Sequence, residues 1–155
     1  MTTIADYTDR LVDVSALQGA VATGEVELRM RLADDGEGGR IVTGIAKLGQ
    51  RFLMELFTEK GSMTFQPATG STFLTELRAG RVRTPGELIG AFHRAMLDVT
   101  RNLQAAEETT DPADELFASA TVDRVRLSNT AAVMYITLSS QDPAAKAILP
   151  LPVVV

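Results

Sequence analysis

The sequence predicts one α+β domain, in which a small, mainly antiparallel or mixed sheet packs against two main helices. Two stretches, residues 44–58 and 85–106, place apolar residues at helical spacing, whereas stretches before and after them have the patterns of strands. Separate runs of helices and strands are typical of α+β folds. A chain of 155 residues also suffices to bury a substantial core.

The composition argues against several classes of function. Apolar residues make up 45% of the chain, and the net charge of −5 gives no overall basic field for nucleic acid or an anionic membrane. No stretch approaches the roughly 20 apolar residues that a membrane-spanning helix needs. The first residues show no secretory signal and cysteine is absent, so we expect a soluble protein made in the cytosol.

The N-terminal part is expected to form an arm, residues 1–24, ahead of a domain over residues 25–155. Residues 26–32 alternate apolar and charged side chains, which indicates a strand with one buried face. Residues 34–39, rich in aspartate and glycine, read as a loop. Residues 40–43 then predict a short strand that completes a hairpin with the first.

Two helices follow. The first begins near Thr43 or Gly44, carries an apolar stripe up to Leu56, and ends before the turn at Lys60-Gly61. The second begins with a capping box, in which Thr84 and Glu87 exchange hydrogen bonds and Pro85 occupies the first helical position. Its apolar stripe runs to about Ala106.

Three strands are predicted at the C-terminal end, over residues 118–127, 131–140 and 147–155. The last has two readings. It either fills the domain's own sheet or pairs with another chain as an added strand, since an unpaired strand offers free backbone groups. Pro150 and Pro152 lack an N–H, so one edge of this segment is broken. In the second reading, the partner-binding residues are Leu149, Leu151, Val153, Val154 and Val155.

Catalytic and metal chemistry have weak support in the sequence. His93 is the one histidine, so a zinc site of the usual ligands is not expected, and it reads as a residue at the boundary of the helical stripe. A glycoside hydrolase needs two carboxylates, and Glu55 and Glu59 lie four apart on one helix. Such pairs are common on surfaces, and nothing predicts the apolar setting that a catalytic acid requires. Further acids are Glu76, Glu87, Asp98 and Asp123. We therefore expect no catalytic residue, metal or cofactor.

Phosphate and nucleic-acid sites are also weakly indicated. The glycine-rich run at residues 36–39 lacks the lysine of a phosphate-binding loop. Arg78, Arg81 and Arg83 form a small basic cluster without interleaved aromatics, which reads as a solvated loop or as a contact for acidic groups of a protein partner.

One motif is more informative. Thr58, Gly61, Pro67 and Gly70 have the spacing Thr-x-x-Gly-x-x-x-x-x-Pro-x-x-Gly, directly after a helix and before an apolar stretch. This order resembles the baseplate wedge subunit family of contractile phage tails and related contractile injection and type VI secretion systems, a family sometimes labelled tail lysozyme. The likeness covers residues 40–155. Ser62 stands where members often carry glutamate, and Asp111-Pro112-Ala113 lacks the arginine of an acid-Pro-Arg motif.

The resemblance implies a structural virion protein of the tail baseplate or of a related contractile particle, with six copies per baseplate. It implies contacts with other wedge proteins, with the tail tube or hub, and with the sheath, whose first ring would exchange strands with it. Nucleic acid and membranes are not implied as partners. The alternative function is a peptidoglycan-cleaving glycoside hydrolase that uses paired carboxylates.

Overall fold

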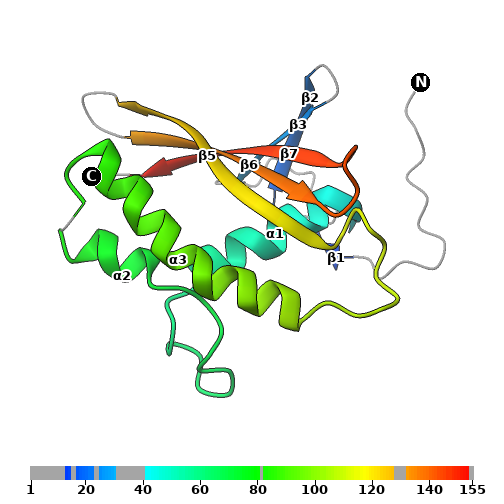
Figure 1. Ribbon diagram of the computed structural model, residues 1–155, viewed down its shortest axis with the longest axis horizontal. Coiled ribbons are helices and arrows are strands. Elements are labelled where there is room, and N and C mark those ends of the chain that lie inside the picture. Colours follow the sequence, from blue (N-terminus) through cyan, green and yellow to red (C-terminus); the bar gives the residue numbers. More distant parts are fainter. Residues whose placement is uncertain are drawn as a thin grey trace.

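The structure is a computed structural model that describes residues 13–14, 17–22, 25–30, 41–80, 82–127 and 132–153. Three helices cover one face of a sheet, and none of the described helices lies on its other face, as Figure 1 shows. The predicted α+β class is confirmed. The helices are α1 (Gly44–Phe57), α2 (Phe73–Arg78) and α3 (Pro85–Ala105); the strands are β1 (Asp13–Val14), β2 (Leu17–Ala22), β3 (Glu25–Met30), β4 (Ile41–Val42), β5 (Phe117–Leu127), β6 (Ala132–Ser140) and β7 (Lys146–Val153).

The main sheet is mixed and has the strand order β2-β3-β7-β6-β5. β5, β6 and β7 pair antiparallel, as do β2 and β3, whereas β3 runs parallel to β7. β1 and β4 form a separate two-stranded sheet. The three strands predicted at the C-terminal end are confirmed, and β7 lies at the centre of the sheet.

Two expectations about the N-terminal part need correction. The predicted hairpin of residues 26–32 with 40–43 is wrong, because β3 pairs with β2 and β7, while β4 pairs with β1. Residues 17–22, within the expected arm 1–24, form β2 of the main sheet. The sequence of β2, Leu-Gln-Gly-Ala-Val-Ala, is mostly small residues, so it shows no clear alternation.

The two main helices form as the sequence predicts. Leu48, Phe52 and Leu56 of α1 are buried, and the helix ends at Phe57. At the start of α3 the capping box is complete: Thr84 Oγ1 accepts from the Glu87 N–H at 3.2 Å, and Glu87 Oε2 accepts from the Thr84 N–H at 3.0 Å. Glu87 also accepts a hydrogen bond from the Arg83 N–H. This bond is the largest of the contacts that lower the pKa of Glu87.

The short helix α2 is not foreseen by the sequence, where its residues read only as an apolar stretch. Six residues are too few for a helical period to be recognised. Its first residue, Phe73, is fully buried and packs edge-on against Phe57 at the end of α1. The tertiary contact thus fixes a helix that is too short to be stable alone.

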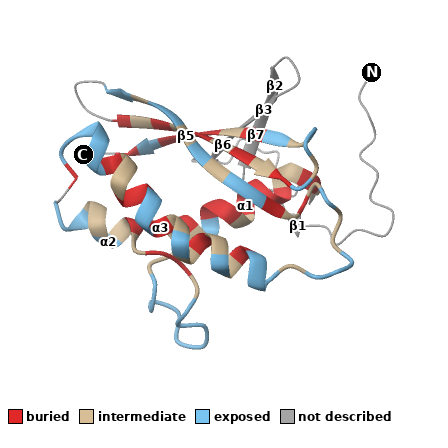
Figure 2. Cartoon of the chain, in the orientation of Figure 1, coloured by how far each residue is buried: buried red, intermediate tan, exposed pale blue. Residues whose placement is uncertain are grey.

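The core lies between the helices and one face of the sheet, where Figure 2 shows the buried residues gathered. β6 alternates strictly, so that every second side chain is buried and those between are half-buried. The buried set on this strand is Ala132, Met134, Ile136, Leu138 and Ser140. In the sheet β6 is an interior strand, between β7 and β5.

The C-terminal segment belongs to the same core. Leu149, Leu151 and Val153 are at most 4% exposed. The prediction that these three residues bind a partner is therefore corrected, because their side chains fill this chain's own core and β7 lies between β3 and β6 in the sheet. Val154 and Val155, predicted to share that role, lie outside the described residues.

Hydrogen-bond phase explains how β7 accommodates two prolines. The Ser140 N–H donates to the Ala145 carbonyl at 3.2 Å, and bonded pairs alternate along an antiparallel ladder. Pro150 and Pro152, opposite Tyr135 and Val133, therefore occupy non-bonded positions, with their nitrogens directed away from β6. On that other side β3 pairs with β7 only at Ala147 and Ile148.

A buried ion pair connects the helical layer to the chain that enters β5. Glu115, 1% exposed, accepts from the Gly44 N–H through Oε1 at 2.9 Å and from Lys47 Nζ through Oε2 at 2.6 Å. The carboxylate thus caps the first turn of α1, where a negative charge is favourable.

We expect Glu115→Gln to destabilise the protein by about 3–5 kcal/mol, because it breaks the buried ion pair with Lys47. The double variant Lys47→Met/Glu115→Gln should recover most of this loss, since the amide oxygen can still accept from Gly44. Urea unfolding measures both. Lys60→Ala, which breaks an ion pair with Asp98 at the surface, is the control and should cost less than about 1 kcal/mol. Equal losses in the single and double variants would contradict the expectation.

For β7, we expect Leu149→Ala to lower the free energy of unfolding by about 2–5 kcal/mol, because it opens a cavity in the core. Pro152→Ala changes an exposed position three residues further along β7 and should have little effect. Thermal and urea unfolding compare the two. A near-neutral Leu149→Ala would mean that the segment is not part of this core.

Candidate functional site

The four motif residues lie in one closed loop, residues 58–71, which joins α1 to α2 and projects from the helical layer (Figure 1). The Ser71 N–H donates to the Thr58 carbonyl at 2.8 Å, and the Lys60 N–H donates to the Ser71 carbonyl at 3.1 Å. Together these bonds close the base of the loop. Between them the chain makes successive turns.

Gly61 and Gly70 both adopt the left-handed conformation, with φ of +85° and +92°. Their surroundings differ. A Cβ at Gly70 would lie 2.3 Å from the Thr58 carbonyl oxygen, whereas a Cβ at Gly61 would meet nothing within 4 Å. Gly70 is therefore required both by conformation and by space, at the point where the loop returns to its start.

Side chains from α1 and α3 hold the closed loop. Glu55 Oε2 accepts from the Gly70 N–H at 2.9 Å and from Asn102 Nδ2 at 3.0 Å. The Asn102 amide also donates to the Ala68 carbonyl at 3.0 Å. The loop is therefore held by hydrogen bonds to two helices, and the tip it presents is preorganised.

The tip of the loop is exposed and neutral. Residues 60–68 are all exposed, and no charged side chain occurs from Gly61 to Gly70. Phe65 is 98% exposed and Met63 is 45% exposed. An aromatic side chain presented in this way on a fixed loop is typical of an anchor in a protein–protein contact.

The carboxylates considered as an acid–base pair are bound to different groups. Glu55 binds the loop, as described, whereas Glu59 accepts from Thr75 Oγ1 at 2.8 Å and from Arg78 Nη1 at 3.0 Å. The other four acids each bind a neighbour too: Glu76 binds Arg94, Glu87 belongs to the capping box, Asp98 binds Lys60 and Arg101, and Asp123 accepts from the Thr137 hydroxyl.

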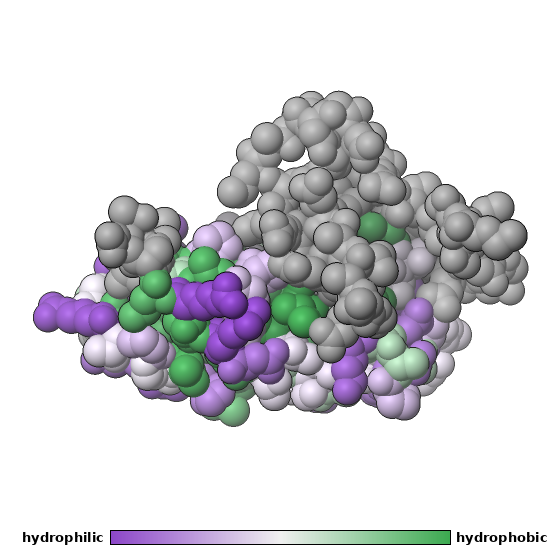
Figure 3. All heavy atoms as spheres, turned by 90° about the horizontal axis from the view of Figure 1, so that it is seen from above, coloured by the Kyte–Doolittle hydropathy of each residue, from purple (hydrophilic) through white to green (hydrophobic). Residues whose placement is uncertain are grey.

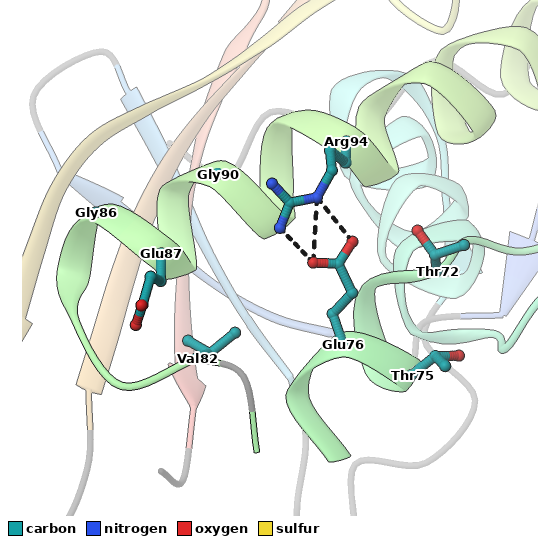
Figure 4. Close-up of a pocket in the computed structure, with 8 residues that line it drawn as sticks. All are labelled: Thr72, Thr75, Glu76, Val82, Gly86, Glu87, Gly90 and Arg94. Carbon is teal, nitrogen blue, oxygen red and sulfur yellow. Dashed lines mark hydrogen bonds and ion pairs between the residues drawn. The ribbon is translucent and has the colours of Figure 1, made fainter. Parts of the chain in front are cut away.

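A surface pocket of about 760 Å³ lies between α2 and the first half of α3 (Figure 4). Glu76 and Arg94 face one another across it, with Arg94 Nε 3.0 and 3.2 Å from the two carboxylate oxygens. This bonding to Glu76 raises the pKa of Arg94. The remaining lining is Thr72, Thr75, Val82, Gly86, Glu87 and Gly90. Its ionisable groups are thus engaged in ion pairing and capping.

The other residues singled out by sequence occupy the surface. His93 is exposed on α3 beside the buried Phe92, with ring centroids 6.0 Å apart. Of the basic cluster, Arg78 pairs with Glu59, Arg83 is exposed, and Arg81 lies outside the described residues. Across the described ranges, no group of three metal-ligating side chains comes together. In the same ranges no helix is long and apolar enough to cross a bilayer.

The sheet margin formed by β5 is the second candidate surface. Within the described part of the chain, β5 pairs with β6 alone, so its other side faces no strand. The strand is eleven residues long and mostly exposed, with register shifts at Phe117/Ser119 and Val122/Arg124. The Phe117 N–H is bound by Glu107 Oε1 at 2.6 Å, so the margin that is open for pairing begins after Phe117.

No protein-family model, curated protein sequence or solved structure matches this chain.

Alanine substitutions at the two glycines test the loop. Gly61→Ala should cost about 1–2 kcal/mol, the penalty for an L-residue at positive φ. Gly70→Ala should lower the free energy of unfolding by about 1–3 kcal/mol more than Gly61→Ala does, because its Cβ overlaps the Thr58 carbonyl. Urea unfolding measures stability, and limited proteolysis within residues 58–71 reports on the loop. Equal effects of the two substitutions would contradict the described closure.

Proposed function

We propose that this protein is a structural baseplate wedge subunit of a contractile tail or related injection particle. In this role it links the tube or hub to the other wedge proteins and accepts a strand from the first sheath ring. The open margin of β5 is the observation that carries the proposal. The resemblance of the motif to the baseplate wedge family is the reason for proposing a contractile tail in particular. The four motif residues lie in one closed loop.

Strand addition needs a margin with both backbone donors and acceptors. β7 does not supply it, because Pro150 and Pro152 remove donors from the side that faces away from β6. β5 contains no proline and therefore keeps an N–H at every residue. We therefore assign partner binding to β5 in place of the C-terminal segment.

The register shifts of β5 limit how a partner can pair. Bulges twist an edge strand and restrict uncontrolled edge-to-edge pairing. On β5 they separate a run of regular pairing at residues 119–122 from another at 124–127. A guest strand of about four residues beside either run satisfies this geometry, which favours a specific short segment over open-ended aggregation.

The exposed tip with Phe65 supports a second contact with an assembly partner. A phenylalanine buries roughly 150–250 Å² when it enters a partner's pocket. The loop lies on the helical side of the molecule, whereas β5 belongs to the sheet (Figure 1). Two separate contact surfaces suit a subunit that joins different neighbours.

The alternative, a peptidoglycan-cleaving hydrolase, requires two carboxylates that converge on one cleft. The acids considered for this role instead bind the loop, an arginine or a neighbouring strand, as described above. These contacts give them structural explanations, so the geometry favours the assembly function.

Paired proline substitutions test the β5 margin. Ala120 and Thr121 are neighbours in one regular run of β5, so their N–H groups face opposite sides of the strand. One of the substitutions Ala120→Pro and Thr121→Pro therefore removes an N–H that faces β6, and the other removes an N–H that faces outward. We expect the outward variant to stay folded, as shown by circular dichroism, but to fail to restore sheathed particles in a deletion strain of the organism that encodes the chain. Electron microscopy of the particles is the measurement.

Wild-type complementation is the positive control, and the inward-facing variant should be destabilised. The same pair of substitutions at Val125 and Arg126 tests the second run, residues 124–127. Normal sheathed particles with the folded outward variants of both runs would contradict docking at β5. Contractile particles that assemble normally without the gene would reject the baseplate function itself.

A further inference from the structure

Two arginines on β5 share one aromatic ring on the sheet face that the helices leave open. The guanidinium carbon of Arg124 lies 4.3 Å from the centroid of the Tyr135 ring, and that of Arg126 lies 5.6 Å from it. Arg124 stands opposite Tyr135 in the register and Arg126 opposite Val133. Figure 3 views this side of the molecule and shows hydrophilic residues directly beside hydrophobic ones.

Neither arginine is neutralised by a carboxylate within the described residues. The ion pairs there involve other cations: Lys47, Lys60, Arg78, Arg94 and Arg101. Asp123, next to Arg124 in sequence, is bound to the Thr137 hydroxyl. Within the described ranges both guanidinium groups are therefore without a carboxylate partner, in a chain whose net charge is −5.

Stacking on Tyr135 orients these charges. A guanidinium lying over an aromatic face keeps its N–H donors free at its edge, which is the geometry for bidentate binding of a carboxylate. Arg124 and Arg126 are two residues apart and project from the same face of the strand. A strand added beside β5 places its own residues i and i+2 next to them on that face.

We infer that the guest strand carries an acid-apolar-acid segment, whose two carboxylates meet Arg124 and Arg126; this inference rests on the proposed function. The middle residue of the segment projects to the helical side, next to the partly buried Val125, and an apolar side chain matches that setting. The segment pairs with residues 124–127, the second regular run of β5.

Single-stranded nucleic acid is the competing ligand for arginines beside an aromatic ring. It needs an exposed ring on which a base can stack, and Arg124 lies over the Tyr135 ring at 4.3 Å. The overall negative charge also opposes a polyanion more than it opposes a short strand with two acids. The geometry therefore favours an acidic protein segment.

Three synthetic peptides of the same β-forming sequence, differing only in a central Glu-Val-Glu, Gln-Val-Gln or Lys-Val-Lys, provide the test. Binding to the full chain is measured by fluorescence anisotropy at low and high salt. We expect the Glu peptide to bind about tenfold more tightly than the Gln peptide at low salt, from two charge pairs across strands. The Lys peptide should bind most weakly.

Variants of the arginines provide the specificity controls. Arg124→Gln/Arg126→Gln should reduce binding of the Glu peptide to the level of the Gln peptide, and Arg124→Glu/Arg126→Glu should reverse the preference toward the Lys peptide. Arg78→Gln/Arg101→Gln removes two exposed arginines elsewhere and should leave the preference unchanged. Circular dichroism verifies that each variant is folded.

The outcomes separate this inference from the proposed function. Equal binding of all three peptides by the wild type would retain strand addition and overturn the charge preference. Binding of none of them would count against the β5 margin as a docking site, and thus against both. Tighter binding of an oligothymidine strand than of the Glu peptide, lost in Arg124→Gln/Arg126→Gln, would assign the face to nucleic acid instead.

Discussion

The buried carboxylate of Glu115 is the constraint on which the arrangement of helices and sheet depends. It receives the first N–H of α1 and the ammonium of Lys47, and it stands two residues before β5. One end of α1 is thereby fixed to the sheet, while the other end continues directly into the closed loop. Because Glu55 on the same helix binds Gly70, the position of the loop is set by a helix that is itself anchored at its start. A buried charge is tolerated here because it is paired and hydrogen-bonded.

The side of β7 that faces away from β6 and the outer side of β5 differ in their backbone chemistry. At β7 the prolines face away from β6 and leave that side short of donors, which protects a strand that β3 covers over only two residue pairs. At β5 the donors remain, and bulges together with arginines define what can pair there. In the proposed function, a partner strand would therefore pair at β5, and the charge of the two arginines would select among candidate strands. The exposed Phe65 lies on a different layer of the molecule.

Features encoded locally could be predicted from the sequence, and features set by long-range pairing could not. The Thr84-Pro85-Gly86-Glu87 start of α3 is determined within four residues, and the stripe of α1 within fourteen. The parallel pairing of Val26 with Ala147 has no local signal in the sequence. The sequence therefore predicts a wrong partner for β3, and it does not decide whether β7 belongs to this chain's own sheet or pairs with another chain. Glycine and proline marked the loop, but Asn102, which holds it, resembles any polar residue on a helix. The apolar C-terminal segment predicts a docking site from sequence. The open margin of β5, by contrast, is identified by the strand order of the sheet, which the sequence does not show.

The parallel contact between β3 and β7 also bears on how the protein reaches its native state. It pairs Val26 with Ala147 and Glu27 with Ile148, so most of the sequence lies between the paired residues. Contacts of such large sequence separation slow folding, because the intervening chain must be ordered before they form. During synthesis β2 and β3 are made before β7, the strand with which β3 pairs. Until β7 is present, the edge of β3 that pairs with it is unpaired, and such an edge is prone to association with other chains.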